Sequence, residues 1–425
     1  MEKQKKRRRM RCINCGSFAV NRNGTRTNVT ISTDRHSIRK VQKYWCRSCG
    51  RFFTKRKEPR KRYSSSLKLE ATRMHVEERQ SFRVIAKRMK ERYGIRTNAR
   101  RMCQMVNEVA KATKSSIEIQ REYKPRWEGY LVVDDKVMNI RGRKKISLIA
   151  RDRRGDPLHS ELLEDATQEE YDNFFRYIVE QLKYPVKAVT TDIDPRLEKA
   201  IKSVISPDIP HQKCIWHALE NIKVMIGYQK TARQYLSSRR LYEQTKDAMH
   251  YQSVPYDSMV ARLQHAQRMA ESFEKEYNGK KDVVETAREI IEELDEKNAL
   301  KLFQRFRQKY KTKYPDVLSF MERHYIGLRI YHTDKYIERT NVTMENFNKQ
   351  LKRRFVTIES FQSSQTAFNY LNLIRNYLRF KPYTDCRGKR RWKNGLCPLE
   401  VCRVKLSSKD WLKNSINLPK LSVVK

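Results

Sequence analysis

Three acidic side chains stand in sequence contexts that suit metal-dependent chemistry on phosphates. Asp134 follows the apolar run 130–133, Asp192 follows a second apolar run, and Glu345 lies in segment 339–348, which reads as a helix start. A carboxylate at the end of a buried strand is held rigidly and faces the sheet edge, where ligands bind. Two Mg²⁺ (or Mn²⁺) ions need oxygen ligands from several elements, and they clamp both reacting oxygens of a phosphoryl transfer. We therefore take these three residues as candidate catalytic residues and magnesium ligands.

Each candidate has an acidic competitor nearby. Asp135 would point to the opposite sheet face if the strand continues past Asp134. Asp194 precedes a proline, which suits a turn. Glu338 precedes Glu345 by two helical turns and could share its face. Glu345 is favoured because it belongs to a polar stripe at helical spacing. The stripe comprises Asn341, Glu345, Asn348 and Lys352.

Two cysteine pairs predict a structural Zn²⁺ site near the N-terminus. The ligands would be Cys12, Cys15, Cys46 and Cys49, in two Cys-x-x-Cys turns each followed by glycine. Four thiolates suit tetrahedral Zn²⁺, and the intervening segment is rich in Thr, Val, Ile and Tyr without a helical period. We expect residues 1–60 to form a zinc β-ribbon that contacts DNA. The alternative is that the metal only stabilises a unit without a core.

Composition points to a polyanionic partner. Lys and Arg number 93 against 49 acidic residues, giving a net charge of +44, and neutralising phosphates releases condensed counterions. Apolar runs are too short to span a bilayer, so we expect no membrane partner. The basic segment 3–9 lacks a following apolar stretch, which argues against a secretory signal; it could be a nuclear address or a phosphate-binding arm. The nine cysteines include two Cys-x-x-Cys pairs, and in a chain with no export signal metal ligation and free thiols are favoured over disulfides.

Residues 61–115 carry the pattern of a helix-turn-helix DNA-binding domain. Three amphipathic helices are expected, with Ser81 capping the second, Gly94 ending it and Thr97 capping the third. A short connection and a basic last helix fit this motif, although an ordinary helical bundle is the alternative. The outward side chains that would read DNA are Arg100, Arg101 and Gln104.

The remaining pattern predicts an α/β core interrupted by helices. Strands at 130–134, 137–141 and 146–151, a helix from 166 to about 182 and a strand at 186–191 describe a sheet covered by helices, as in ribonuclease H-like folds. Residues 112–126 read as a linker. The expected divisions are 127–217 for the first part of an RNase H-like mixed-sheet core, 218–335 for a large helical insertion, 336–382 for the last part of the core and 383–425 for a basic, irregular C-terminal tail.

The sequence does not decide the roles of several further cysteines and histidines. Cys214 and His217 could bind a metal with His211 or His332 as helpers, or could form a thiol–imidazole contact that supports the wall of the site. Three later cysteines have scattered spacing, which favours free thiols over a second metal site. They are Cys386, Cys397 and Cys402.

The order of these motifs resembles a DDE transposase of a prokaryotic insertion sequence, akin to the mutator-like group of the RNase H-like superfamily. The resemblance rests on Asp134-Asp135-Lys136-Val137, on Thr191-Asp192, on Cys214-x-x-His217, on Asn341 with Glu345 and Lys352-Arg353-Arg354, on the paired cysteine knuckles, and on the tail Gly395-Leu396-Cys397-Pro398-Leu399-Glu400. The family implies Mg²⁺-dependent DNA cleavage followed by strand transfer. Asp134, Asp192 and Glu345 would be the catalytic triad, and Cys214 with His217 would support it.

The resemblance also implies partners and a location. Double-stranded DNA would bind as the terminal inverted repeats of the element and as target, with Lys352, Arg353 and Arg354 on phosphates. Paired DNA ends imply a homodimer or a higher oligomer, in the cytoplasm or nucleoid of a prokaryote. Two rival functions remain: a structure-selective nuclease on the same core, which would cut without joining, and a non-catalytic, domesticated DNA-binding regulator. The predicted sequence-reading domains argue against the first rival, and the three acids argue against the second.

Overall fold

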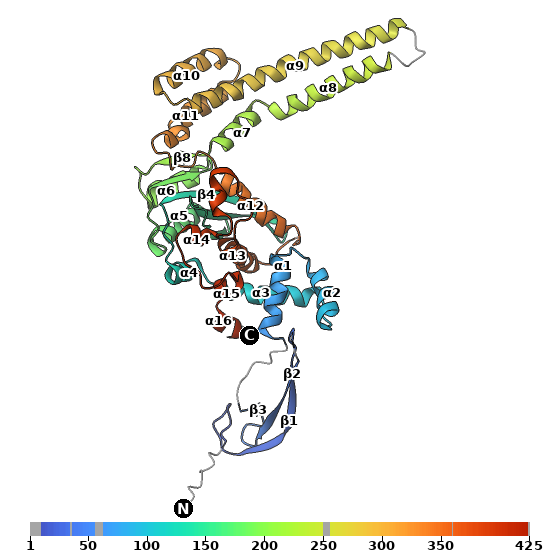
Figure 1. Cartoon of the computed structure of the whole chain (residues 1–425), viewed down its shortest axis with the longest axis vertical. Helices are drawn as coiled ribbons and strands as arrows, with labels where there is room; N and C mark the ends of the chain where they lie inside the picture. Colours follow the sequence, from blue (N-terminus) through green and yellow to red (C-terminus); the bar gives the residue numbers. More distant parts are fainter. Residues whose placement is uncertain (1–9, 35, 56–62, 250–255, 359, 424–425) are drawn as a thin grey trace, which may run out of the picture.

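The protein is elongated, with a β-ribbon at one end, an α/β body in the middle and a helical arm at the other end (Figure 1). The computed structural model describes residues 10–34, 36–55, 63–249, 256–358 and 360–423, and it leaves the side chains of residues 256, 342, 343 and 345 undescribed. The basic N-terminal segment 3–9 lies outside the described residues.

The N-terminal unit is a three-stranded antiparallel sheet. Strands β1 (Val20–Thr30), β2 (Ser37–Cys46) and β3 (Phe52–Thr54) pair in that order, which confirms the expected ribbon. Its buried apolar residues are few, namely Cys12, Cys46 and Phe53. So small a core stabilises a fold weakly unless something else crosslinks the strands.

Three helices follow the ribbon, as the sequence predicts. They are α1 (Ser65–Val76), α2 (Phe82–Tyr93) and α3 (Ala99–Lys111). Ser81 caps α2, and Gly94 ends it with a positive φ of 66° that suits glycine. The expected cap of α3 is wrong by one residue, because the side chain of Asn98, not Thr97, accepts the Arg101 backbone N–H at 2.9 Å.

The expected linker contains a helix instead. Helix α4 (Ser116–Tyr123) begins at a capping box, in which Ser115 and Glu118 satisfy each other's backbone N–H groups. Ile119 is buried, so the helix packs against the body and the polar composition of this segment is misleading.

The body is built on a five-stranded mixed sheet. Its strands are β4 (Tyr130–Ile140), β5 (Arg143–Asp152), β6 (His159–Leu163), β7 (Ala188–Thr191) and β8 (His211–Lys213), in the order β6-β5-β4-β7-β8. The first three strands along the chain are antiparallel, whereas β7 and β8 run parallel to β4 and to each other. The expected strands 130–134 and 137–141 are one continuous strand, so Asp134 lies within β4 and does not end it.

Helices cover both sheet faces because side chains of β4 alternate between them. Leu131 and Val133 pack with α5 (Gln168–Arg176), its π-helical extension (Tyr177–Gln181) and α6 (Pro195–Val204). On the other face Val132 and Met138 belong to a core with α12 (Val342–Phe355) and α13 (Ser364–Phe380).

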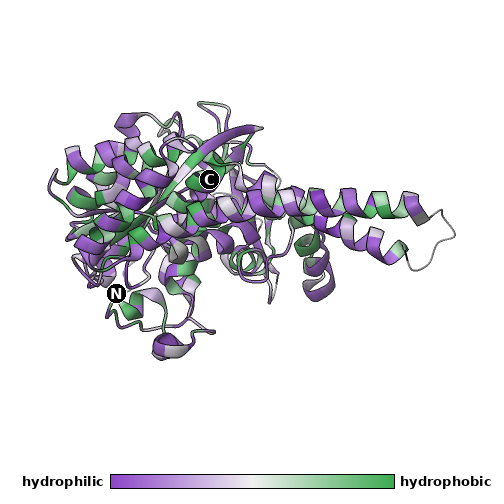
Figure 2. Cartoon of the chain, turned by 90° about the horizontal axis from the view of Figure 1, so that it is seen from above, coloured by the Kyte–Doolittle hydropathy of each residue, from purple (hydrophilic) through white to green (hydrophobic). Residues whose placement is uncertain are grey.

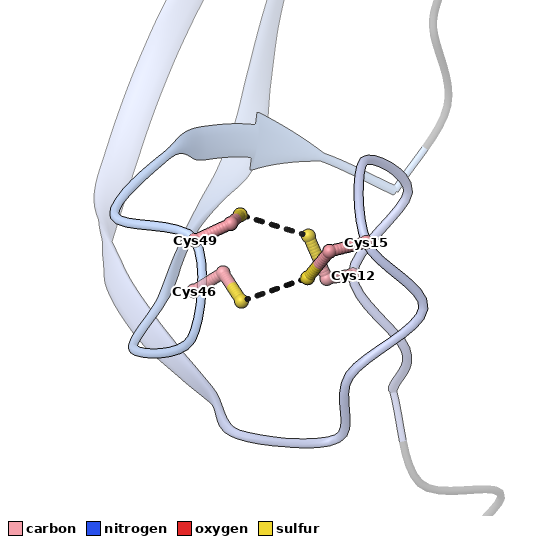
Figure 3. A group of neighbouring side chains, drawn as sticks. All are labelled: Cys12, Cys15, Cys46 and Cys49. Atoms are coloured by element: carbon pink, nitrogen blue, oxygen red, sulfur yellow. Dashed lines mark hydrogen bonds between the residues drawn. The ribbon is translucent and has the colours of Figure 1, made fainter.

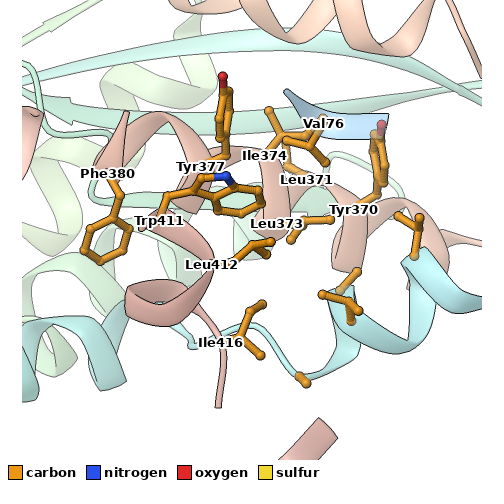
Figure 4. Packing of buried hydrophobic residues seen from close by; sticks show 14 of the residues in the cluster. Val76, Tyr370, Leu371, Leu373, Ile374, Tyr377, Phe380, Trp411, Leu412 and Ile416 are labelled. Carbon is orange, nitrogen blue, oxygen red and sulfur yellow. The ribbon is translucent and has the colours of Figure 1, made fainter. Parts of the chain in front are cut away.

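The C-terminal segment packs into the same core and is not an irregular tail. It forms the short helices α14 (Pro398–Val401), α15 (Trp411–Ser415) and α16 (Leu418–Val423). Trp411, Leu412 and Ile416 lie against α13 in Figure 4, within a hydrophobic cluster that also includes residues of α1 and α3. The tail is basic overall, but a few well-placed apolar residues fix its position.

The long insertion is helical, as expected. It comprises α7 (Ile215–Met225), α8 (Tyr228–Ala248), α9 (Tyr256–Glu292), α10 (Glu296–Tyr310), α11 (Pro315–Arg329) and a short 3-10 turn (Ile330–His332). Helices α8 and α9 project as a largely hydrophilic pair (Figure 2). Among the described residues, no helix is both long and apolar enough to cross a membrane.

Candidate functional site

The strand register brings Asp134 and Asp192 together. In the parallel pair of β4 and β7, Val132 lies opposite Thr190, so each acid stands two residues further along its strand direction, at the same level of the sheet. One carboxylate oxygen each from Asp134, Asp135 and Asp192 lie within 4.8 Å of one another. Residues separated by 58 positions in the sequence therefore form one acidic cluster at the end of β7.

The acidic cluster also includes Asp135. The alternation of side chains along a strand predicts that this residue faces away from Asp134. Its side chain does alternate to the α5/α6 side, where Asp194 and Arg196 influence its pKa. However, β7 ends at Thr191, so on the β7 side no strand residue separates the two faces of β4 at this level, whereas β5 continues along the other side.

Burial and like charge dominate the electrostatics of the cluster. Asp134 is 6 % exposed, and desolvation together with the neighbouring Asp192 and Asp135 raises its pKa to about 7. The pKa of Asp135 is raised too, by burial and by Asp192. Asn348 donates a side-chain hydrogen bond to Asp134, which fixes the orientation of that carboxylate.

Asp192 is held by two groups from other elements. Asn341 Nδ2 donates to Asp192 Oδ1 at 2.6 Å, and His217 Nδ1 lies 2.6 Å from the same oxygen. Burial disfavours a charged imidazole, but Asp192 and Cys214 outweigh it and raise the pKa of His217 to about 10. The raised pKa favours a charged imidazolium beside Asp192.

Cys214 joins this arrangement from the N-cap position of α7. Its sulfur accepts the backbone N–H of Asn341 at 3.3 Å, and donor atoms of Asp192, Cys214 and His217 lie within 4.8 Å of one another. The expected helpers are elsewhere, since His211 contacts Thr191 Oγ1 at 2.8 Å and His332 contacts the Ile291 carbonyl at 2.9 Å. The third member of the group is Asp192, which the spacing of the motif could not reveal.

Helix α12 presents its N-terminal end to the acids. Asn341 occupies the N-cap position and Asn348 lies two turns into the helix, and these two residues contact Asp192 and Asp134 respectively. Glu345 occupies a helical position between them, at the spacing of the same face. Its side chain lies outside the described part of the structure, so its role stays a prediction.

The two remaining acidic competitors have other roles. Glu338 precedes α12, so it does not share a helical face with Glu345, and Arg151 Nη2 binds both of its oxygens at 2.8 and 2.9 Å. Asp194 caps α6 by accepting the backbone N–H of Arg196 at 2.7 Å. Both acids are therefore committed to structural contacts.

The donor set of the acidic cluster fits a hard divalent cation. Carboxylate and amide oxygens are the ligands that Mg²⁺ prefers, and a cation would offset the mutual repulsion of the three aspartates. The amide oxygens of Asn341 and Asn348 are also buried and accept no hydrogen bond from the described residues. Buried polar atoms of this kind need an explanation, and a cation in the cluster would give one.

The four N-terminal cysteines form a second and separate group (Figure 3). All four sulfurs lie within 4.8 Å of one another, with 3.7 Å between Cys12 and Cys49 and 3.6 Å between Cys15 and Cys46. A tetrahedral Zn²⁺ site with ~2.3 Å bonds has sulfurs ~3.8 Å apart. The cluster is compatible with a zinc finger. The later Cys386, Cys397 and Cys402 are free thiols and form no such group within the described ranges.

The predicted DNA-contacting residues divide into exposed and buried ones. Arg100 and Gln104 are exposed on α3, and Arg101 Nη1 donates to Gln104 Oε1 at 3.0 Å. Lys352 and Arg353 are exposed on α12.

The prediction that Arg354 contacts DNA phosphates is wrong, because the residue is buried. It is only 1 % exposed, its Nε donates to the Val76 carbonyl at 2.9 Å, and its guanidinium lies over the Tyr377 ring at 4.7 Å. It ties α12 to α1 and α13 and cannot reach a phosphate. Successive helical residues point about 100° apart, so one residue of a basic run can face a helix that packs behind α12 while the others face outward.

The fold and the site together define a mixed α/β protein with a partly buried acidic cluster where two parallel strands meet a helix end. Residues 145–221 match the family model of the MULE transposase domain, which confirms the expected resemblance to mutator-like transposases. The match includes Asp192, Cys214 and His217, and it supports a transposase role with DNA as substrate. No curated protein matches the chain.

Proposed function

We propose that the chain is a DDE transposase, which cuts DNA at the ends of a mobile element and joins the freed ends to target DNA. The body would be an RNase H-like core. Its strand order, with three antiparallel strands followed by two parallel ones, supports this assignment. Two DNA ends must be handled together, so the working form would be at least a dimer.

The observation that carries the proposal is the meeting of acids from distant strands. Asp134 comes from β4 and Asp192 from the end of β7, and their carboxylates converge beside the helix that bears Glu345. A structural protein gains nothing from three close carboxylates in mutual repulsion, one of them buried and two half-buried. Such a cluster is typical of functional sites that hold cations.

Each element would have a defined task. When bound, Mg²⁺ would supply charge stabilisation and a more acidic water ligand. Asp134, Asp192 and Glu345 would hold the ions, and His217 with the two asparagines would keep the carboxylates oriented. The zinc ribbon and the helix-turn-helix would bind element ends, and Lys352 and Arg353 would contact phosphates.

The decisive experiment is a strand-transfer assay with a labelled element end and a target plasmid. The test variants are Asp134→Asn, Asp192→Asn and Glu345→Gln, and we expect each to abolish joined products. Asp194→Asn is the matched control. It removes a nearby carboxylate, yet asparagine caps a helix as well as aspartate does, so joining should persist.

The outcomes separate the proposal from its rivals. Joining that is lost in all three test variants but kept in the control supports a transposase. Cleavage without joining would indicate a structure-selective nuclease. Specific binding without any metal-dependent product would indicate a non-catalytic regulator.

A further inference from the structure

Two large aromatic side chains are exposed on a surface that the proposed chemistry does not use. Trp392 is 61 % exposed within the 3-10 helix η3 (Gly388–Lys393), and Tyr336 is 43 % exposed before α12. Tryptophan and tyrosine are normally covered in a monomeric protein, and exposed ones that gather on one surface indicate an interaction site.

The loop that carries Trp392 is fastened at its base. Tyr383 and Asn394 form a backbone bridge, and the Gly395 N–H donates to the Tyr383 carbonyl at 2.8 Å. The side chain of Asn394 closes the loop further, because it accepts the Cys386 N–H at 2.9 Å and donates to the Cys386 carbonyl at 3.1 Å. Trp392 is therefore presented on a closed loop and not on a loose tail.

The base of this loop also rests tightly on the body. Tyr383 packs on Gly155, where an added Cβ would come within 2.3 Å of the tyrosine oxygen, and the φ of 110° at Gly155 also requires glycine. Lys393 Nζ donates to the Arg154 carbonyl at 3.4 Å. The loop thus has a fixed position next to the β5–β6 turn.

The charged side chains of the loop are mostly positive, since Asp385 is the one acid among residues 383–395. Four cations of the loop are exposed, and no ion pair joins any of them to a carboxylate within the described part of the chain. They are Arg387, Lys389, Arg390 and Arg391. Unpaired cations beside an exposed indole suit an anionic partner that also offers flat apolar faces.

Tyr336 extends the same surface across the β5–β6 turn. The Arg153 guanidinium lies 4.8 Å and the Lys335 ammonium 5.2 Å from the centre of its ring. Arg153 adjoins Arg154, whose carbonyl holds Lys393 of the loop. The surface is distinct from the acidic cluster, because Arg153 follows β5 at the end that pairs with the start of β4. Asp134 is four residues, or ~13 Å of strand, further along β4.

We propose that Trp392, Tyr336 and the cations around them form a binding surface for unpaired nucleotides of a DNA strand. In a duplex the base faces are stacked on each other and unavailable, whereas a single strand offers both bases for aromatic stacking and phosphates for the cations. In the context of the proposed function, such a strand would arise where DNA is opened at a cleaved end.

The test measures the binding of two probes by the full-length, zinc-loaded protein. The probes are a labelled oligothymidylate and a labelled duplex of equal length, followed by fluorescence anisotropy. Trp392→Ala and Tyr336→Ala should each weaken binding of the single strand about 5- to 100-fold, as expected for the loss of one stacked base. Trp392→Phe should retain most of the affinity because it keeps an aromatic face.

The control removes a comparably exposed aromatic residue from an element with no proposed role in DNA binding. Phe368 of α13 is 37 % exposed, and Phe368→Ala should leave single-strand binding unchanged. Thermal unfolding of each variant checks that the fold is intact.

Selective loss of single-strand binding in both alanine variants supports the proposal. Equal losses for single strand and duplex would overturn it in favour of a general phosphate surface, and unchanged affinity would overturn it outright. The proposed transposase function fails separately, through absent strand transfer, and its failure would leave this binding result standing.

Discussion

The molecule contains two clusters of side chains that could bind metal, and the two differ in how much apolar packing surrounds them. The four cysteines lie in a ribbon whose buried apolar residues are few. The acidic cluster lies in a body where α5, α6, α12 and α13 bury large apolar side chains on both faces of the sheet. We therefore expect metal binding to stabilise the ribbon, whereas apolar packing stabilises the body that positions the acidic cluster.

This difference predicts different responses to loss of the metal. A structural zinc supplies much of the folding free energy of a small unit. A packed sheet can hold mutually repelling carboxylates in place without help, because its stability comes from apolar burial. The first site should therefore couple metal to folding, and the second should couple metal to activity alone.

Removing zinc should have the largest effect. Treatment with a strong zinc chelator should unfold residues 10–55, because apparent binding free energies of structural zinc are ~10–16 kcal/mol. The α/β body should remain folded. Limited proteolysis with mass spectrometry, and titration of the freed thiols, would follow the change.

Cys15→Ser should reproduce the effect, while the equally conservative Cys103→Ser on α3 should not. A ribbon that stays protease-resistant after zinc is removed would show that its packing suffices alone.

Neutralising the acidic cluster should act on catalysis and not on folding. Asp134→Asn should lower strand transfer about a thousandfold or more, since it removes a ligand of the proposed ions. Its thermal stability should be unchanged or higher, because burial and like charge already disfavour the carboxylate and raise the pKa of Asp134 to about 7. Parallel activity and thermal-melting measurements test this; a large drop in melting temperature would contradict the contrast between the sites.

Two neighbouring basic residues of α12 should differ by their burial. Arg354→Gln should lower the free energy of unfolding by about 2–4 kcal/mol, since it removes a buried side chain with a hydrogen bond and a ring contact. Lys352→Gln should change stability by less than ~0.5 kcal/mol. It should weaken DNA binding alike for all sequences and reduce the salt dependence by about one charge. Denaturant unfolding and salt-dependent binding distinguish the two; equal stability losses would refute the assignment.

Acidification should weaken the body through buried neutral histidines. Burial, and for His75 also Arg354, lowers the pKa of His75 and of His159 to about 4. His75 is placed between the Gln80 carbonyl and the Tyr370 hydroxyl. The histidines of the unfolded chain bind protons at a higher pH than those of the folded chain. Their contribution to the free energy of unfolding is therefore fully present above pH ~6.5 and falls as the pH drops toward 4.

The loss should be on the order of 2–3 kcal/mol for each histidine. Urea unfolding at several pH values measures it, and His75→Gln should flatten the profile. A variant as pH-sensitive as the natural protein would exclude His75 as a source.

Local features could be predicted from the sequence because they depend on neighbours along the chain. The cysteine spacing predicted the ribbon, Ser81 and Gly94 predicted the ends of α2, and the charged periodic segments predicted the helical insertion. The tail motif with Pro398 and Glu400 resembles the C-terminal segment of the family, and it also has a local structural role. Physically it starts α14, with proline in the first turn and Glu400 closing a capping box.

The sequence by itself determined which residues could bind metal, where several helices begin or end, and that so basic a chain suits a polyanionic partner. Tertiary structure alone decided that Asp135 joins Asp134 and Asp192, that His217 faces Asp192, and that Arg354 is buried. The physical reason is that side chains far apart in sequence meet only through strand register and helix packing, which no local pattern encodes.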